Sequence, residues 1–175
     1  MRLDKLIIMQ MLTDLLSEPY DFTYQDARGG HTIQFTPGGV YRGRKTVSVE
    51  DNVAYAISVL EAPRATIGSP ADVEGRQRAE DWTLNVQGWP PEDREHPSDP
   101  AYVMAAAVRQ RMAKLIDSDR ETGAPLFPEW FMFNKMVHNI QFGATIVTPA
   151  TAEVSKVAFW YMPVVVSLVQ QTRTR

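Results

Sequence analysis

The side chains that most often perform chemistry are sparse and scattered in this sequence. The three histidines, His31, His96 and His138, lie far apart, and none belongs to an H-x-x-x-H or H-E-x-x-H spacing. The chain has no cysteine, which excludes disulfides, thiolate metal sites and cysteine nucleophiles and suits a reducing compartment. No G-x-S-x-G elbow is present, and the paired carboxylates stand beside turn signals, as solvated loop ends do. The sequence therefore predicts no catalytic residue, no cofactor and no metal site.

One segment approaches a phosphate-binding loop. Gly38 is followed, after four residues, by Gly43-Arg44-Lys45-Thr46, whereas the motif needs lysine directly after the glycine. No convincing strand precedes Gly38, and no helix clearly follows Thr46. A small enzyme that binds a phosphate-containing ligand through this segment is therefore kept as an alternative from another class. A thermal shift with nucleotides that disappears in Lys45→Ala would favour it.

Basic side chains gather in two clusters that could meet phosphate or an acidic protein surface: Arg42, Arg44 and Lys45, then Arg64, Arg76 and Arg78. Charge reversal of the second cluster is expected to impair assembly but not folding. A nucleic-acid-binding adaptor that uses the first cluster is a further alternative, and filter binding at rising salt would test it. The net charge of −3 argues against global attraction to nucleic acid. Trp89, beside Pro90-Pro91 on the polar face of its strand, is predicted to be exposed at an interface.

The length and composition predict one core-forming domain over residues 1–175. The chain has 175 residues, of which 44% are hydrophobic and 22% charged. Asp4 and Asp14 interrupt the N-terminal apolar pattern, so a signal peptide is not expected. No apolar run approaches the roughly 20 residues that span a bilayer, so no membrane partner is expected.

Three elements are clear from periodicity. Apolar residues at helical spacing predict a helix from Leu3 that ends before Pro19. Strict alternation predicts a strand over residues 81–89, with Trp82 on a buried face and the other face polar. Ser98-Asp99-Pro100 predicts the start of a long helix, with Asp99 as its cap and with Arg111 mostly facing water.

The other segments give weaker signals. Residues 52–61 fit a strand or a helix, and their β-branched and aromatic content favours the strand. The remaining expectations are a turn-rich stretch over residues 20–40 with a short strand at 32–35, an exposed loop at 62–79, a short helix opened by Pro128 and Glu129, a hairpin or meander over 137–148 and 154–169, and a flexible tail at 171–175. Pro163 predicts an edge, a bulge or a break in the last strand. Together they predict an α+β fold, with a mainly antiparallel sheet packed against one long central helix and an N-terminal helix, and with long polar loops.

The order of these features resembles the tail terminator, or tail completion, family of long-tailed bacteriophages. The resemblance spans about residues 1 to 170 and rests on an ordered string of short motifs: Gly43-Arg44, Glu61-Ala62-Pro63, the strand from Trp82 to Gly88, Pro100-Ala101-Tyr102, Ala107-Val108-Arg109, Val147-Thr148-Pro149 and Phe159-Trp160. None of these motifs is specific alone, and their order carries the resemblance.

The resemblance implies a structural virion protein without catalysis. It implies a homo-hexameric ring that closes the tail tube, contacts the tube and the sheath protein on one side and a neck or connector protein on the other, and lets DNA pass with weak contact. The location would be the virion, and the host cytoplasm during assembly. The six clustered basic residues and Trp89 are then candidates for protein interfaces or the DNA channel. A different neck, connector or minor tail role is the alternative within this class.

Overall fold

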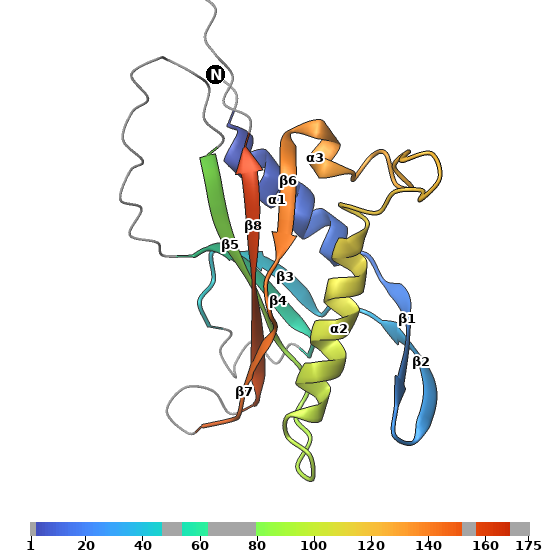
Figure 1. Cartoon of the computed structure of the whole chain (residues 1–175). Coiled ribbons are helices and arrows are strands. Elements are labelled where there is room, and N and C mark those ends of the chain that lie inside the picture. The colour runs from blue at the N-terminus through green and yellow to red at the C-terminus, as the bar shows by residue number, and fades with distance from the viewer. Residues whose placement is uncertain (1–2, 47–53, 63–79, 152–156, 169–175) are drawn as a thin grey trace, which may run out of the picture.

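The computed structural model describes residues 3–46, 54–62, 80–151 and 157–168, and Figure 1 shows how their elements are arranged. In chain order the elements within these ranges are α1 (Asp4–Ser17), β1 (Tyr20–Asp26), β2 (Gly29–Phe35), β3 (Gly39–Arg42), β4 (Ala56–Glu61), β5 (Glu80–Trp89), α2 (Asp99–Ala113), α3 (Met132–Lys135), β6 (Val137–Phe142), β7 (Ile146–Thr148) and β8 (Phe159–Leu168). The predicted loop at 62–79 and the tail at 171–175 lie almost wholly outside the described residues.

A six-stranded mixed sheet forms the centre of the molecule. Its strand order is β3-β4-β5-β8-β6, and β7 also pairs with β8. β3 and β4 run parallel, whereas the other neighbouring pairs are antiparallel. α1 contacts β3 and β4, α2 contacts β5 and β8, and the two helices contact each other beside the sheet (Figure 1). The predicted α+β class, with an N-terminal helix and a central helix on a mainly antiparallel sheet, is confirmed.

The core lies between the two long helices and one face of the sheet. Every second residue of β5 pairs with every second residue of β8 on this face: Trp82 with Val166, Leu84 with Val164, and Val86 with Met162. All of them are buried in one cluster with the apolar stripes of α1 and α2. Gly88 continues the row opposite the buried Trp160, and a Cβ at Gly88 would lie 2.7 Å from the indole ring. Glycine is therefore needed there for the ring to lie flat on β5.

Pro163 lies inside β8, which is an interior strand, so it is not at an edge as one interpretation allowed. The break falls in the neighbouring strands instead, because β6 ends opposite Val164 and β7 begins opposite Tyr161. The amide of Gly143 donates to the Pro163 carbonyl (2.8 Å), which places the donor-free nitrogen of Pro163 on the side of this interruption. A Cβ at Gly143 would lie 2.4 Å from the proline ring, so glycine permits this close approach.

The β1–β2 hairpin was missed by sequence analysis, which predicted only a short strand at 32–35. The two strands pair along their whole length, from Tyr20 opposite Phe35 to Asp26 opposite Gly29. Phe22 and Phe35 are buried in the main core, whereas the residues farther out are mostly exposed. The glycines at 29–30 are typical of a turn, so the alternating aromatic and polar residues before them were assigned to a turn-rich stretch and not to a strand.

Two helix predictions need correction. The cap of α2 is Ser98 and not Asp99, which is the first helical residue. The predicted short helix after Pro128 is instead the single turn α3, in which Met132 to Lys135 all have positive φ between 50° and 62°. Left-handed backbone costs about 1–2 kcal/mol per residue. The side chain of Phe133 is wholly buried and the Met132 amide bonds the Leu115 carbonyl (2.8 Å), which hold the turn in place.

Candidate functional site

The best-defined candidate surface is the basic segment, residues 42–45, which carries three of the predicted site residues. Its first residue, Arg42, is the last residue of β3, the strand at one edge of the sheet. The amide of Gly43 donates to the Val59 carbonyl (2.8 Å), and its φ of 77° then turns the chain, a conformation that suits glycine. The segment therefore leaves the strand direction and crosses toward the middle of the sheet.

Buried side chains of two neighbouring strands fix the backbone of the basic segment. Ser58 Oγ of β4 donates to the Arg44 carbonyl (2.7 Å). Gln87 Nε2 of β5 donates to the carbonyls of Arg44 (2.9 Å) and Lys45 (3.0 Å). Ser58 and Gln87 are both buried, so the predicted polar face of β5 is not a solvated face. Instead, Gln87 on this face of β5 holds the backbone of the basic segment.

The three basic side chains of the segment are exposed and are held by different partners. The Arg44 guanidinium stacks over the Tyr41 ring at 4.3 Å. Arg42 donates from Nη1 to the Thr13 hydroxyl of α1 (3.1 Å), so it lies on the helix side of the sheet. Lys45 is exposed beside them. Three positive charges on a fixed backbone suit contact with carboxylates or phosphates, because little chain entropy is lost when the contact forms.

The phosphate-loop interpretation does not fit this geometry. The four residues between Gly38 and Gly43 form β3, which pairs with β4, whereas a phosphate loop needs them as a cradle of backbone amides. In addition, the main-chain groups fixed at Arg44 and Lys45 are carbonyl acceptors. Carbonyl oxygens repel a phosphate, so these fixed main-chain groups cannot attract one.

Trp89 is not the exposed interface residue that the sequence predicted. Its exposed fraction is 7%, and its ring stacks on that of Phe159, the first residue of β8, with centroids 6.5 Å apart. The alternation of β5 does place Trp89 on the face away from the helices. The neighbouring strand, however, presents another aromatic ring there. Arg64, Arg76 and Arg78 lie outside the described residues.

The histidines do not converge. His31 Nε2 lies 3.0 Å from Asp26 Oδ1 in the hairpin, and the Arg28 amide and this imidazole hold the pKa of Asp26 below its usual value. The His96 amide donates to Asp93 in a tight turn and, with the Glu95 amide, lowers the pKa of that carboxyl. Among the described residues, no group of three histidine or acidic side chains could hold a metal ion.

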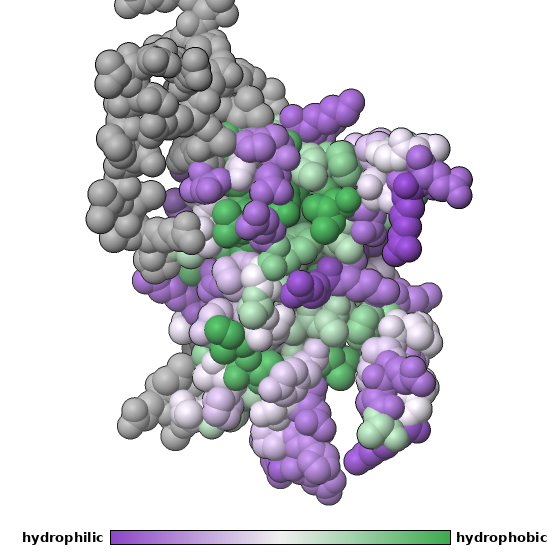
Figure 2. All heavy atoms as spheres, viewed as in Figure 1, coloured by the Kyte–Doolittle hydropathy of each residue, from purple (hydrophilic) through white to green (hydrophobic). Residues whose placement is uncertain are grey.

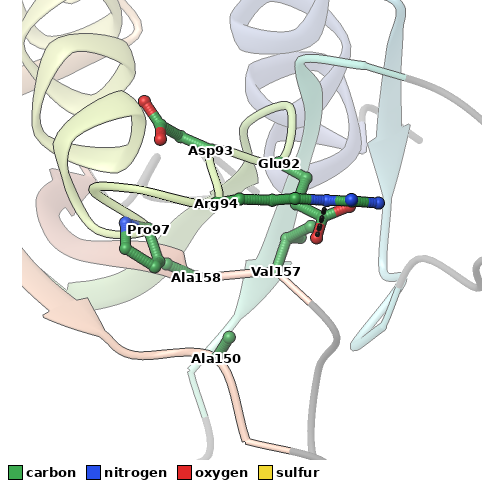
Figure 3. Close-up of a pocket in the computed structure, with 7 residues that line it drawn as sticks. All are labelled: Glu92, Asp93, Arg94, Pro97, Ala150, Val157 and Ala158. Atoms are coloured by element: carbon green, nitrogen blue, oxygen red, sulfur yellow. Dashed lines mark ion pairs between the residues drawn. The ribbon is translucent and has the colours of Figure 1, made fainter.

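A shallow pocket of about 230 Å³ lies where the loop after β5 meets the start of β8 (Figure 3). Its lining is Glu92, Asp93, Arg94, Pro97, Ala150, Val157 and Ala158. Arg94 Nε and Glu92 Oε1 are 3.6 Å apart and largely exposed, and Figure 3 shows the Asp93 carboxylate pointing away from this pair. Among the described residues, the lining includes no hydroxyl, imidazole or amide side chain.

Sequence analysis missed the residues that shape the basic segment, namely Tyr41, Ser58 and Gln87. A polar residue inside the apolar run of β4 was the one available signal, because a buried serine needs a hydrogen-bond partner. No family model matches this chain, and no curated protein matches it. In the part of the chain that the structure describes, no helix is both long and apolar enough to cross a membrane.

Proposed function

We propose that this protein is a structural component of a bacteriophage tail, a ring that closes the tail tube and joins it to the neck. The observation that carries the proposal is the agreement between the ordered motifs of the resemblance and the ends of the elements. Gly43-Arg44 directly follows β3, and Glu61 ends β4. Pro100-Ala101-Tyr102 opens α2, and Thr148 ends β7 before Pro149. Phe159-Trp160 begins β8.

Element boundaries are a stricter test than element order. Five of the seven motifs lie at the ends of elements, whereas Ala107-Val108-Arg109 lies inside α2 and the segment from Trp82 to Gly88 is the interior of β5. Proline and glycine do the stopping, because proline lacks a backbone donor and glycine permits a positive φ. The agreement between these motifs and the ends of the elements is what supports the resemblance and, through it, the proposed ring.

The surface offers contacts of the kind that such a ring needs. Large apolar side chains are exposed at five described positions: Leu3, Leu6, Tyr102, Leu126 and Ile146. Figure 2 shows hydrophobic patches among polar groups on the face that carries α2, β6 and β7. In the proposed ring, this chain is the partner of its own copies, with the tail tube and sheath protein on one side and a neck protein on the other.

DNA would pass through the ring with weak contact only. The chain carries a net charge of −3, and its basic segment carries three positive side chains, of which Arg42 lies on the helix side of the sheet. Three phosphate contacts give weak binding that falls steeply as salt rises. The protein would assemble in the host cytoplasm and remain in the virion.

Native mass spectrometry and electron microscopy of the purified protein, alone and with tail tubes, test this proposal. We expect closed rings, alone or on tube ends, and caps that stop tube growth. Arg94→Glu, an exposed change in the β5–α2 loop, serves as the control and should not affect assembly. A protein that stays monomeric and does not cap tubes would refute the proposal. Turnover of a metabolite, lost on changing one polar residue, would favour the enzyme alternative.

A further inference from the structure

The connection between α2 and β6 contains a strained turn. All four residues of α3, Met132–Lys135, have a positive φ between 50° and 62°, and none of them is glycine. Residues other than glycine visit this region singly and not in succession, and asparagine does so most readily. Asn134 is therefore the one residue of the four that suits the turn. Backbone of this kind persists only where the surrounding structure holds it.

Two long-range contacts hold the strained turn. The side chain of Phe133 is wholly buried in the main core. The amide of Met132 donates to the Leu115 carbonyl (2.8 Å), near the end of α2. The side chains of Asn134 and Lys135 are exposed and add no burial. The turn therefore stays in place as long as the contacts of Phe133 and Met132 outweigh the strain of four residues.

The three strands that follow the turn, β6, β7 and β8, form a unit that we call the C-terminal strands. β6 and β7 both pair with β8. β8 pairs in turn with β5, from Leu168 opposite Glu80 to Trp160 opposite Gly88 (Figure 1). Within the described ranges, the C-terminal strands therefore join the rest of the sheet along β5 alone.

β5 and β8 are matched residue by residue. Trp82 lies opposite Val166 and Leu84 lies opposite Val164, and all four are buried. A second copy of this chain carries the same β5, so the C-terminal strands of one copy fit β5 of another copy with the same register. Such an exchange keeps the buried pairs, and the connection no longer has to turn back within one chain. Short connections under strain favour exchange for this reason.

We propose that copies of this chain exchange their C-terminal strands, so that β8 of one copy pairs with β5 of the next, and that the left-handed turn α3 is the hinge. The inference rests on the proposed ring, because it supplies the joint between neighbouring copies. A series in which each copy passes its C-terminal strands to the next is head to tail, and such a series closes into a ring when its rotation permits. Release of the strain in α3 favours the exchanged form, whereas burial of Phe133 and the entropy lost on association favour the monomer.

Disulfide formation tests the exchange, because the chain contains no cysteine of its own. Ser167 Oγ of β8 donates to Asp81 Oδ1 of β5 (2.6 Å), and the two residues are direct partners in the sheet. Chains with Asp81→Cys and chains with Ser167→Cys are unfolded in urea, mixed, refolded together and oxidised. Exchange brings one thiol from each kind of chain together, so the assembled fraction should contain disulfide-linked pairs of the two variants. Glu121→Cys, exposed in the turn after α2, replaces Asp81→Cys as the control and should give no such pairs.

The role of the hinge is tested with Lys135→Gly, because glycine adopts a positive φ without steric cost. Relief of the strain should raise the melting temperature of the monomer and lower the ratio of exchanged to monomeric chains by about fivefold. Lys135→Ala removes the same side chain without relieving the backbone, so it should not lower the ratio. Gln110→Gly, exposed in the middle of α2, should lower the melting temperature and leave the ratio unchanged.

The outcomes separate this inference from the proposed function. Rings or tube caps without disulfides between Asp81→Cys and Ser167→Cys chains would overturn the exchange and leave the proposed function standing. Equal ratios for Lys135→Gly and Lys135→Ala would overturn the role of α3 as the hinge. Disulfides between chains of a protein that forms no ring and caps no tube would support the exchange and refute the proposed function, whereas an obligate monomer would refute both.

Discussion

Replacing Arg111 with alanine is expected to loosen the joint between α1 and α2. Arg111 was predicted to face water, but its exposed fraction is 7%. From α2, its Nε donates to the Leu15 carbonyl in the last turn of α1 (3.0 Å), and its Nη2 pairs with the Glu18 carboxylate. The guanidinium also lies 5.1 Å from the centre of the Tyr20 ring. One side chain therefore fixes the end of α1 against the central helix.

The Leu15 carbonyl needs this donor for a reason found in the sequence. In an α-helix the carbonyl of residue 15 accepts from the amide of residue 19, and residue 19 is proline, which has no N–H. Arg111 supplies the missing donor. Without it, a carbonyl at a buried joint is left without a partner, which costs about 1–3 kcal/mol.

Loss of the ion pair between Arg111 and Glu18 costs less than loss of the donor to the Leu15 carbonyl. The Glu18 side chain is 63% exposed, so water can replace its ion pair and the loss is about 0–1 kcal/mol. Arg111→Ala should therefore lower the free energy of unfolding by about 1–4 kcal/mol. Glu18→Gln is the matched control, and it should cost less than about 1 kcal/mol.

Urea unfolding followed by tryptophan fluorescence and by circular dichroism measures these differences. Arg111→Lys keeps the charge and one donor, and we expect a loss between those of the other two variants. If Arg111→Ala costs less than about 1 kcal/mol, or no more than Glu18→Gln, the carbonyl is satisfied without Arg111 and the reasoning is wrong.

Three further predictions concern the core, a close approach and a turn. Trp82→Ala should destabilise the fold by about 3–5 kcal/mol, and a measured loss under about 1 kcal/mol would show that the buried face of β5 is misassigned. Gly88→Ala should cost about 1–3 kcal/mol in urea unfolding, because its Cβ meets a buried indole. Gly30→Ala, which meets nothing within 4 Å, should cost less. The Thr122 amide and hydroxyl and the Glu121 amide hold the pKa of Asp119 below its usual value, so its contribution is present above about pH 4 and is lost as pH falls through the folded-state pKa. The melting-temperature difference between the parent and Asp119→Asn should therefore shrink steadily below pH 4, and a difference that does not depend on pH would contradict this.

The elements that sequence analysis predicted correctly are those whose own periodicity carries the signal. α1, β5 and α2 each have an apolar face with the repeat of a helix or a strand, and each has a terminator that acts locally. The β1–β2 hairpin was missed because its polar face and its glycines resemble a loop. A short helix opened by Pro128 and Glu129 was predicted where the chain forms the positive-φ turn α3, because burial of Phe133 and a bond to Leu115, distant in the sequence, outweigh local preference.

For the candidate site, the sequence by itself determined that three basic residues, Arg42, Arg44 and Lys45, follow one another closely along the chain, whereas the fold decided that Arg42 lies on the helix side of the sheet. The sequence also determined the need for a donor near Pro19, because a missing N–H is a property of the residue. Only the tertiary structure decided that Gln87 holds the basic segment and that Arg111 is the donor. These partners are separated by 43 and 96 positions in the chain, and no local pattern specifies a hydrogen bond that exists only once the sheet and the helices have packed.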